Sequence, residues 1–403
     1  MKYLIGWLEI GLLNDDHFKM KLAIVTTHPV QYYDPVFKLI ARSGKAELKV
    51  FYTWGEASNK KLDPGFGRVI EWDIPLLDGY SFEFLLNNAK DPGTHHFRGI
   101  INPNAVEQID RFNPDILLII GWGWNSHLKI MRHYKGKLPL WFRGDSTLID
   151  NKQNFKNILR TILLKFVYSH INKAFYVGKA NKAYFLKSGL KENQLIFAPH
   201  AVDNSRFELN RSNEAFVVRQ ELNLLQTDIL ILYAGKLEPK KDPLILLDAF
   251  IQIANPDIHL LFLGNGILEK NLKSKVKNEK VEKVHFRDFQ NQQILPVYYQ
   301  ACDLFCLPSK GPGETWGLSV NEAMSCGKAV LVSDKVGCST DLVEPGINGE
   351  VFQAGNRVSL IEKLLALTAA PHNLMQYGLA SKVIIHRWNF KAIVDTIIKE
   401  LNQ

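Results

Sequence analysis

The sequence predicts an α/β protein made of two doubly wound domains, in which parallel sheets are covered by crossover helices. Short apolar runs alternate with longer segments of helical periodicity along the chain, and this alternation is typical of βαβ units. The length of 403 residues accommodates two domains at roughly 150 residues each. A polar segment near residues 202–227 separates two series of predicted strands, so we place the domain boundary there.

The first domain is predicted to span residues 20–205 and the second residues 206–383. In the first, apolar runs predict strands at 22–26, 48–52, 116–120, 138–142, 174–177 and 195–198. In the second, they predict strands at 229–234, 259–263, 284–286, 304–307 and 329–332. The last piece, residues 384–403, is predicted as a terminal helix that begins near Trp388.

The composition is that of a soluble globular protein, with 46% hydrophobic and 22% charged residues. It excludes disordered, collagen-like and disulfide-scaffold classes. No apolar run approaches the roughly 20 residues that a transmembrane helix needs. Met20 directly precedes a complete first strand, so an upstream extension is one interpretation of residues 1–19. The cysteines form no Cys-x-x-Cys pair and are predicted as reduced, buried thiols of a cytoplasmic protein; they are Cys302, Cys306, Cys326 and Cys338.

The net charge of +8 arises from one stretch. Residues 151–191 contain nine basic residues and no acidic one, and without them 40 basic residues face 41 acidic ones. Apolar residues at three-and-four spacing predict an amphipathic helix over residues 152–170, with Lys152, Lys156 and Arg160 off its apolar stripe. This helix either packs on the sheet with a solvated basic face or meets an anionic membrane surface. Nucleic acid is not favoured as a partner, because no aromatic-interleaved basic groove accompanies the charge.

The most informative segment is residues 308–327. It follows a predicted buried strand, passes through a turn rich in Pro and Gly, and enters a helix near Gly317. Backbone amides at such a helix start attract anions, which predicts a phosphate there. Glu314 lies in the loop and Glu322 about a turn and a half inside the helix, so both carboxylates can accept hydrogen bonds from hydroxyls beside a diphosphate. The alternative is an ordinary helix with solvated glutamates.

This segment resembles the Glu-x7-Glu motif of family 4 glycosyltransferases. Seven positions match in register, and Thr315 and Ser319 replace the family's Gly and Pro; the matches are Glu314, Gly317, Leu318, Glu322, Ala323, Met324 and Gly327. The resemblance is strong over residues 233–352 and patchy in the first domain. It implies a GT-B fold: two Rossmann-like domains face a cleft, the second holds the donor nucleotide, the first holds the acceptor, and helix 384–403 packs back on the first.

A second element agrees with the resemblance. Residues 235–243 follow the strand at 229–234, and Lys236 and Lys241 stand where the family has Arg and Lys. Cations there would hold the donor diphosphate and stabilise charge on the leaving phosphate oxygen without a metal. The turn at residues 264–266 looks like the family's Gly-x-Gly turn, although most such turns are structural. An aromatic segment at residues 286–289 lies where the family commonly lodges the nucleotide base.

The resemblance implies retaining transfer of a sugar from a nucleotide diphosphate to an acceptor hydroxyl. Glu314, Lys236 and Lys241 would be the catalytic residues, with Glu314 orienting the donor sugar. Donor binding would fall to Glu322, which takes the ribose, and to Gly317, Leu318, Thr315, Trp316, Gly235 and Gly264. No Asp-x-Asp motif is present, so we predict metal-independent activity with no cofactor beyond the nucleotide sugar.

Candidate acceptor-side residues come from the first domain. Residues 26–35 open directly from the first strand and resemble a His-Pro-Val/Ile-Gln-Tyr form found in a subset of the family. His28 and Gln31 would contact donor or acceptor hydroxyls, and a purely structural His28 stays equally open. Arg143 occupies the place where the family often has a His beside the reacting sugar, and Asp145 is a candidate hydroxyl ligand.

Other functions are compatible with parts of this sequence pattern. A sugar-nucleotide epimerase, a phosphorylase or a non-catalytic sugar-nucleotide-binding protein would share the fold, but the presence of both motif glutamates and both lysines argues against a decayed binding protein. A nicotinamide-dependent dehydrogenase would need Gly-x-Gly-x-x-Gly after the first strand, and residues 26–32 contain no glycine. The expected acceptor is a glycan or a lipid-linked glycan, in the synthesis of a cell-surface polysaccharide. The protein is expected to be cytoplasmic, with peripheral binding to the inner face of the membrane as an option.

Overall fold

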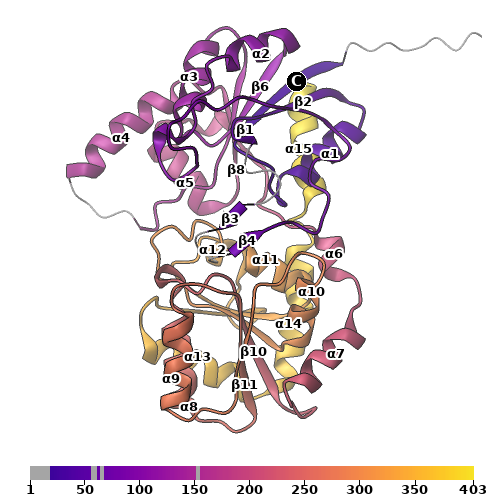
Figure 1. The fold of residues 1–403 in the computed structure, drawn as a ribbon, viewed down its shortest axis with the longest axis vertical. Helices are drawn as coiled ribbons and strands as arrows, with labels where there is room; N and C mark the ends of the chain where they lie inside the picture. The colour runs from indigo at the N-terminus through magenta and orange to yellow at the C-terminus, as the bar shows by residue number, and fades with distance from the viewer. Residues whose placement is uncertain (1–18, 56–60, 64–67, 151–154) are drawn as a thin grey trace, which may run out of the picture.

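A computed structural model describes residues 19–55, 61–63, 68–150 and 155–403. Figure 1 shows two α/β domains, one above the other, each with helices around a central sheet. The first sheet has the strand order β5-β2-β1-β6-β7-β8-β9 and the second the order β12-β11-β10-β13-β14-β15. All neighbouring strands in both sheets pair in parallel. The predicted fold class of two doubly wound domains is therefore confirmed.

The elements of the first domain are β1 (Met20–Thr26), α1 (Asp34–Arg42), β2 (Ala46–Tyr52), β3 (Lys61–Asp63), β4 (Arg68–Ile70), β5 (Ser81–Phe84), α2 (Ala105–Phe112), β6 (Ile116–Ile120), α3 (Asn125–Tyr134), β7 (Leu140–Arg143), α4 (Phe155–Tyr168), β8 (Lys173–Tyr176), α5 (Lys179–Lys187) and β9 (Leu195–Phe197). Strands β3 and β4 form a separate antiparallel hairpin.

The remaining elements are α6 (Asn204–Glu208), α7 (Ser212–Glu221), β10 (Ile229–Ala234), α8 (Pro243–Ile253), β11 (Ile258–Leu263), α9 (Glu269–Asn278), β12 (Val284–Arg287), α10 (Leu295–Ala301), β13 (Leu304–Leu307), α11 (Leu318–Ser325), β14 (Ala329–Ser333), α12 (Ser339–Leu342), β15 (Gly349–Phe352), α13 (Arg357–Thr368), α14 (Pro371–Ile385) and α15 (Phe390–Leu401).

Every predicted strand is present, with ends within two residues of the expected ones. Sequence reasoning missed β5 and β15, which lie at sheet edges, and the hairpin β3–β4. Strand β5 has both ends exposed and β15 begins with a glycine, so neither forms the apolar run by which the inner strands were found. Short edge strands therefore escaped a search for buried runs.

The sheets are buried on both faces. Successive residues of β1 alternate between two apolar clusters, with Leu22 and Ile24 in one and Ala23 and Val25 in the other, as the two-residue period of a strand requires. In each domain the first strand lies between neighbours reached in opposite directions, β1 between β2 and β6 and β10 between β11 and β13. Ligands of doubly wound sheets bind at such switch points, at the carboxyl ends of the strands.

Helix α15 returns the chain to the first domain. It packs against α1, and Phe390, Ile393 and Ile397 join the core of the first sheet. Figure 1 shows this C-terminal helix, in yellow, beside the indigo α1. The Asn389 side chain caps the helix by accepting a hydrogen bond from the Ala392 amide at 2.8 Å. Both chain segments that cross between the domains, near residues 198–203 and 386–390, therefore pack on the core of the first domain.

Helix α4 forms within the predicted span, but its predicted packing is wrong in part. Leu164 and Val167 face the core, whereas the side chains of Leu159, Ile162 and Phe166 are 51–61% exposed. The predicted apolar stripe includes Val167, which is buried, but its other described members are exposed. Leu164, which the periodicity did not select, is buried instead. Lys152 lies outside the described residues, as do the side chains of the helix up to residue 158.

Two further expectations can be compared with the fold. All four cysteines are free and buried, as predicted. Within the described residues, every helix falls short of the length or the apolar content that crossing a bilayer demands.

Candidate active site

A pocket of about 330 Å³ lies between the domains, at the carboxyl ends of β10 and β11 and the start of α11. Predicted site residues that line it are Gln31, Gly235, Lys236, Lys241, Gly264, Leu318 and Glu322. The first domain contributes Gln31, Tyr32 and Trp72. The pocket therefore occupies the crevice that the topology predicts, and both domains form its wall.

The start of α11 forms one side of the pocket. Gly317 caps the helix with φ +94°, and a Cβ at this position would lie 2.7 Å from Val336 Cγ1. A glycine is therefore required both by the left-handed backbone and by the close contact. The next two residues, Leu318 and Ser319, line the pocket. The first amides of a helix have no intrahelical partner, so this end of the pocket favours an anion.

Lys241 and Glu314 form an ion pair behind this wall. The Lys241 Nζ lies 2.5 Å from Glu314 Oε2, and the two side chains are only 17% and 8% exposed. The Ser309 hydroxyl donates to the same carboxylate oxygen at 2.9 Å. Lys241 also lines the pocket, as does Lys236. The fold thus gathers the three predicted catalytic residues in one place, with Lys241 between the buried carboxylate and the pocket.

Glu322 is the buried carboxylate of the pocket. Its Oε2 accepts a hydrogen bond from the Tyr299 hydroxyl at 2.8 Å, and its Oε1 accepts one from the Tyr32 hydroxyl at 3.1 Å. Burial raises the pKa of Glu322, and the two hydrogen bonds oppose that rise by stabilising the ionised form. Burial and the neighbouring carboxylate raise the pKa of Tyr32, so its hydroxyl keeps its proton and remains a donor.

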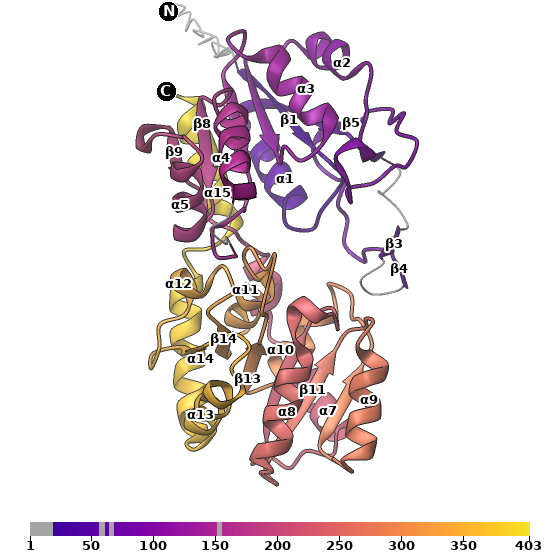
Figure 2. The ribbon, with the colours of Figure 1, turned by 90° about the vertical axis from the view of Figure 1, so that its left-hand side faces the viewer.

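Sequence reasoning missed an arm of the first domain that reaches the second. The Asn291 side-chain amide donates to the Glu71 carbonyl at 2.5 Å, and the Gln293 amide donates to the Asp73 carboxylate at 3.1 Å. Between these contacts Trp72 lines the pocket, with its ring centroid 6.4 Å from that of Phe289. Figure 2 shows the hairpin β3–β4, which precedes this arm, extending from the first domain toward the second.

Arg143 and Asp145 lie away from the pocket lining. The Arg143 guanidinium is buried and donates to the carbonyls of Ala198 and Pro199 at 2.9 and 2.7 Å. Asp145 accepts a hydrogen bond from the Thr315 hydroxyl at 2.7 Å, across the domain interface. In this arrangement Arg143 holds the segment that leaves the first domain, and Asp145 joins the first domain to the loop that carries Glu314.

Two other predicted site residues contact the protein rather than the pocket. Trp316 is 3% exposed and donates from its indole to Asn321 at 2.8 Å. Its ring packs against that of Trp388, with centroids 5.2 Å apart. His28 is within hydrogen-bond distance of the Thr27 hydroxyl, at 2.9 Å, and its ring meets the edge of another aromatic ring in the first domain.

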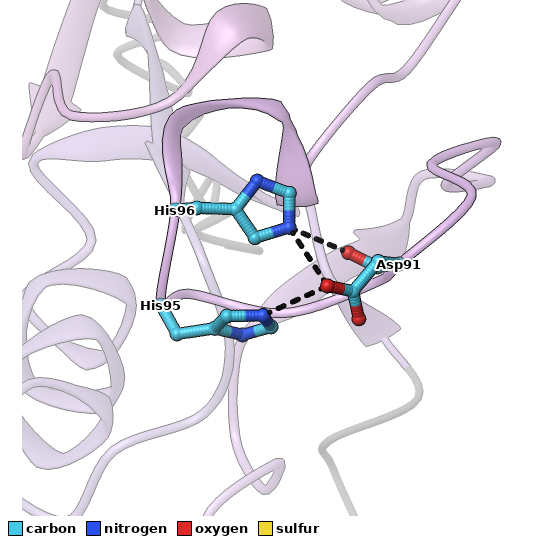
Figure 3. A group of neighbouring side chains, drawn as sticks. All are labelled: Asp91, His95 and His96. Atoms are coloured by element: carbon cyan, nitrogen blue, oxygen red, sulfur yellow. Dashed lines mark hydrogen bonds and ion pairs between the residues drawn. The ribbon is translucent and has the colours of Figure 1, made fainter.

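Within the described residues, one group of three side chains offers metal-ligating atoms, and it was not predicted. Figure 3 shows the rings of His95 and His96 turned toward the Asp91 carboxylate. His95 Nε2 lies 3.1 Å from Asp91 Oδ2, and His96 Nε2 lies 3.0 Å from the Asp91 carbonyl oxygen and 3.3 Å from Oδ2. The group is largely exposed, and none of its members lines the pocket.

The comparisons with known proteins agree with this geometry. Residues 216–381 match the sequence model of the family described as glycosyl transferases group 1. This match lies within the second domain. The matched segment carries Lys236, Lys241, Glu314 and Glu322. The predicted resemblance to a glycosyltransferase family is confirmed over this segment.

Named relatives of this chain are glycosyltransferases. It is 28% identical to the D-inositol 3-phosphate glycosyltransferase of Segniliparus rotundus over 50% of this chain and 45% of that protein. It is 27% identical to the phosphatidyl-myo-inositol mannosyltransferase of Mycobacterium leprae over 42% of this chain and 45% of that protein. The chain thus matches about half the length of these relatives.

The whole fold has relatives among solved structures. Anabaena HepE in complex with UDP and glucose superposes with a TM-score of 0.72 and 18% identity, over 95% of this chain and 99% of that one. The likeness extends across both domains, so the chain has the GT-B fold that the Glu-x7-Glu resemblance implied.

We expect Lys241→Met to lower the free energy of unfolding by about 3–5 kcal/mol, because it leaves the Glu314 carboxylate buried without its cation. Adding Glu314→Gln should recover most of that loss, since a neutral amide needs no counter-ion. Urea unfolding of the two single variants and the double variant measures the coupling.

Lys240→Met is the matched control for this cycle, because the Lys240 side chain is 42% exposed and lies 3.3 Å from its partner carboxylate. It should cost about 1 kcal/mol or less. A double variant as unstable as Lys241→Met alone would contradict the pairing.

Proposed function

We propose that the chain is a retaining glycosyltransferase that moves a sugar from a nucleotide diphosphate to an acceptor hydroxyl. The observation that carries this proposal is the single pocket in which a helix start and two lysines adjoin two buried carboxylates. Cations and helix amides suit a diphosphate, and carboxylates suit the hydroxyls of the sugars on either side of it. Anabaena HepE, which shares the fold, was crystallised with UDP and glucose, and this supports a nucleotide sugar as the donor.

The donor diphosphate would lie between the start of α11 and the loop that follows β10. Lys236 and Lys241 would stabilise the negative charge that develops on the departing phosphate oxygen. Lys241 contacts Glu314 and also lines the pocket. Its charge would therefore stabilise both the Glu314 carboxylate and the diphosphate. Glu314 would orient the donor sugar, and Glu322 would accept hydrogen bonds from the ribose. Trp72 and Phe289 offer aromatic surface for the base.

The acceptor reaction needs a proton to leave the attacking hydroxyl. In a retaining transfer on one face of the sugar, a phosphate oxygen of the departing diphosphate can take that proton. Two lysines at the pocket would provide the electrophilic stabilisation that a divalent cation supplies in other phosphate chemistry. We therefore propose a transfer that uses neither a metal ion nor a dedicated protein base.

For the acceptor, we propose a lipid-linked or membrane-associated glycan. The Mycobacterium leprae relative is named for a transfer involving phosphatidyl-myo-inositol, and this chain exposes an apolar helix face on its first domain. Leu159, Ile162, Leu163 and Phe166 are 48–61% exposed on α4. Arg160 and Lys165 are exposed on the same helix. Figure 1 shows α4 at the outer edge of the first domain. Exposed apolar side chains flanked by cations suit the interface of an anionic bilayer.

Donor binding is tested with a panel of UDP-, GDP-, ADP- and dTDP-sugars, scored by thermal stabilisation and by transfer. We expect one donor class to bind the wild type, and Glu322→Ala and Lys241→Ala to weaken it at least about tenfold, because each removes a charged hydrogen-bonding group. Lys270→Ala, at an exposed position of α9, should bind as the wild type does. The product should keep the anomeric configuration of the donor in NMR spectra. Failure of every nucleotide sugar to bind would refute the donor site.

Metal independence predicts that turnover in excess EDTA stays within about twofold of the untreated rate, because the lysines supply the charge stabilisation. Initial rates with and without chelator measure this. A complete loss of turnover that Mg²⁺ or Mn²⁺ restores would overturn this part of the proposal.

Membrane binding is tested by sedimentation with vesicles of phosphatidylcholine and phosphatidylglycerol at three to one. Ile162→Ser with Phe166→Ser should reduce bound protein at least about tenfold, since each exposed apolar side chain adds about 1.5–3 kcal/mol when it enters an apolar phase. Met375→Ser with Val383→Ser removes two apolar side chains that are more exposed, at 65% and 74%, from α14 of the second domain and should leave binding unchanged. Equal binding by all three proteins would remove α4 as the membrane contact.

A further inference from the structure

Tyr32 connects the first domain to the donor-site glutamate. It lies in the loop between β1 and α1, and its hydroxyl donates to Glu322 Oε1 at 3.1 Å across 290 positions of sequence. The Tyr32 ring packs against the core of the second domain. Tyr32 and Glu322 both line the pocket. A side chain of the presumed acceptor domain thus reaches into the donor half of the cleft.

The two tyrosines donate to different oxygens of the Glu322 carboxylate. Tyr299 donates to one oxygen and Tyr32 to the other, so each oxygen of the carboxylate keeps a lone pair for a further donor. Two hydroxyls on neighbouring carbons of a ribose can meet two such oxygens together. Loss of one tyrosine donor would free the carboxylate to rotate and would favour its protonated form, because burial already raises the pKa of Glu322.

The backbone around Tyr32 holds the side chain in place. The amides of Tyr33 and Asp34 donate to the Val30 carbonyl at 2.9 and 3.0 Å, which closes a turn across Tyr32. The Asp34 carboxylate then accepts a hydrogen bond from Tyr52 at 2.8 Å, inside the first domain. The loop is therefore tied to the first sheet, and the Tyr32 hydroxyl presents a fixed donor to the second domain.

We propose that Tyr32 is a positioning residue that determines the ribose specificity of the donor site. It fixes the Glu322 carboxylate so that its two oxygens accept hydrogen bonds from the 2′ and 3′ hydroxyls of a nucleoside diphosphate. This inference rests on the proposed donor site and adds to it a contribution from the first domain. Without the Tyr32 hydroxyl, the site keeps its phosphate contacts and loses its preference for ribose over 2′-deoxyribose.

The test compares dissociation constants of UDP with 2′-deoxy-UDP, and of GDP with 2′-deoxy-GDP, by calorimetry. The wild type should prefer the ribonucleotide of the pair that it binds by at least about tenfold, because the 2′ hydroxyl contacts a charged acceptor. In Tyr32→Phe this ratio should fall to within about twofold of unity, through weaker binding of the ribonucleotide. Affinity for the 2′-deoxynucleotide should change less than about threefold, which also reports that the variant is folded.

Tyr33→Phe is the matched control, because Tyr33 is the next residue in the loop and its ring stacks on His200, away from the pocket lining. Its ratio should equal that of the wild type. A full ribose preference in Tyr32→Phe, or a wild type that binds nucleotides without any ribose preference, would overturn the role of Tyr32 and leave the donor site standing. A wild type that binds none of the four nucleotides would instead overturn the donor site itself.

Discussion

The burial of two carboxylates is the constraint on which the site depends. Glu314 and Glu322 are 8% and 3% exposed, and a buried charge is costly unless it is paired or hydrogen-bonded. Lys241 and a serine satisfy the first, and two tyrosines satisfy the second. Because these partners come from the loops after β1, β10 and β13 and from α10, the carboxylates hold the loops of the cleft in register. The two carboxylates that we propose bind the donor therefore also stabilise the arrangement of these loops.

The same constraint links the arrangement of the domains to the pocket. One partner of Glu322 comes from the first domain, and the loop that carries Glu314 receives a second cross-domain contact between Thr315 and Asp145. The return of α15 to the first sheet and the arm around Trp72 add two more connections. A change in domain orientation would therefore break the Tyr32 hydrogen bond to Glu322 and the Thr315 contact beside Glu314, and a ligand that binds Glu322 would in turn favour one orientation.

Local patterns were enough to predict the inner strands and the two loops that carry Lys241 and Glu314. The strands β6, β10 and β13 were placed without error because a buried parallel strand is a continuous apolar run. Lys241 and Glu314 were singled out because two short motifs resemble those of family 4 glycosyltransferases. Tyr32, Tyr299 and Trp72 were missed because their roles depend on contacts between segments far apart in sequence. The packing of α4 was wrong in part, since periodicity shows that a helix has an apolar face but not which elements will cover it.

The segment that begins at Glu314 also connects the two domains. Asn321, next to Glu322 on α11, accepts from the Trp316 indole and donates to the His200 carbonyl at 3.0 Å. His200 belongs to the segment through which the chain leaves the first domain, where the Arg143 guanidinium holds the two preceding carbonyls. A displacement of that crossing segment would move α11, and with it Glu322. The contacts that join the two domains therefore also couple the domain orientation to the position of Glu322 in the pocket.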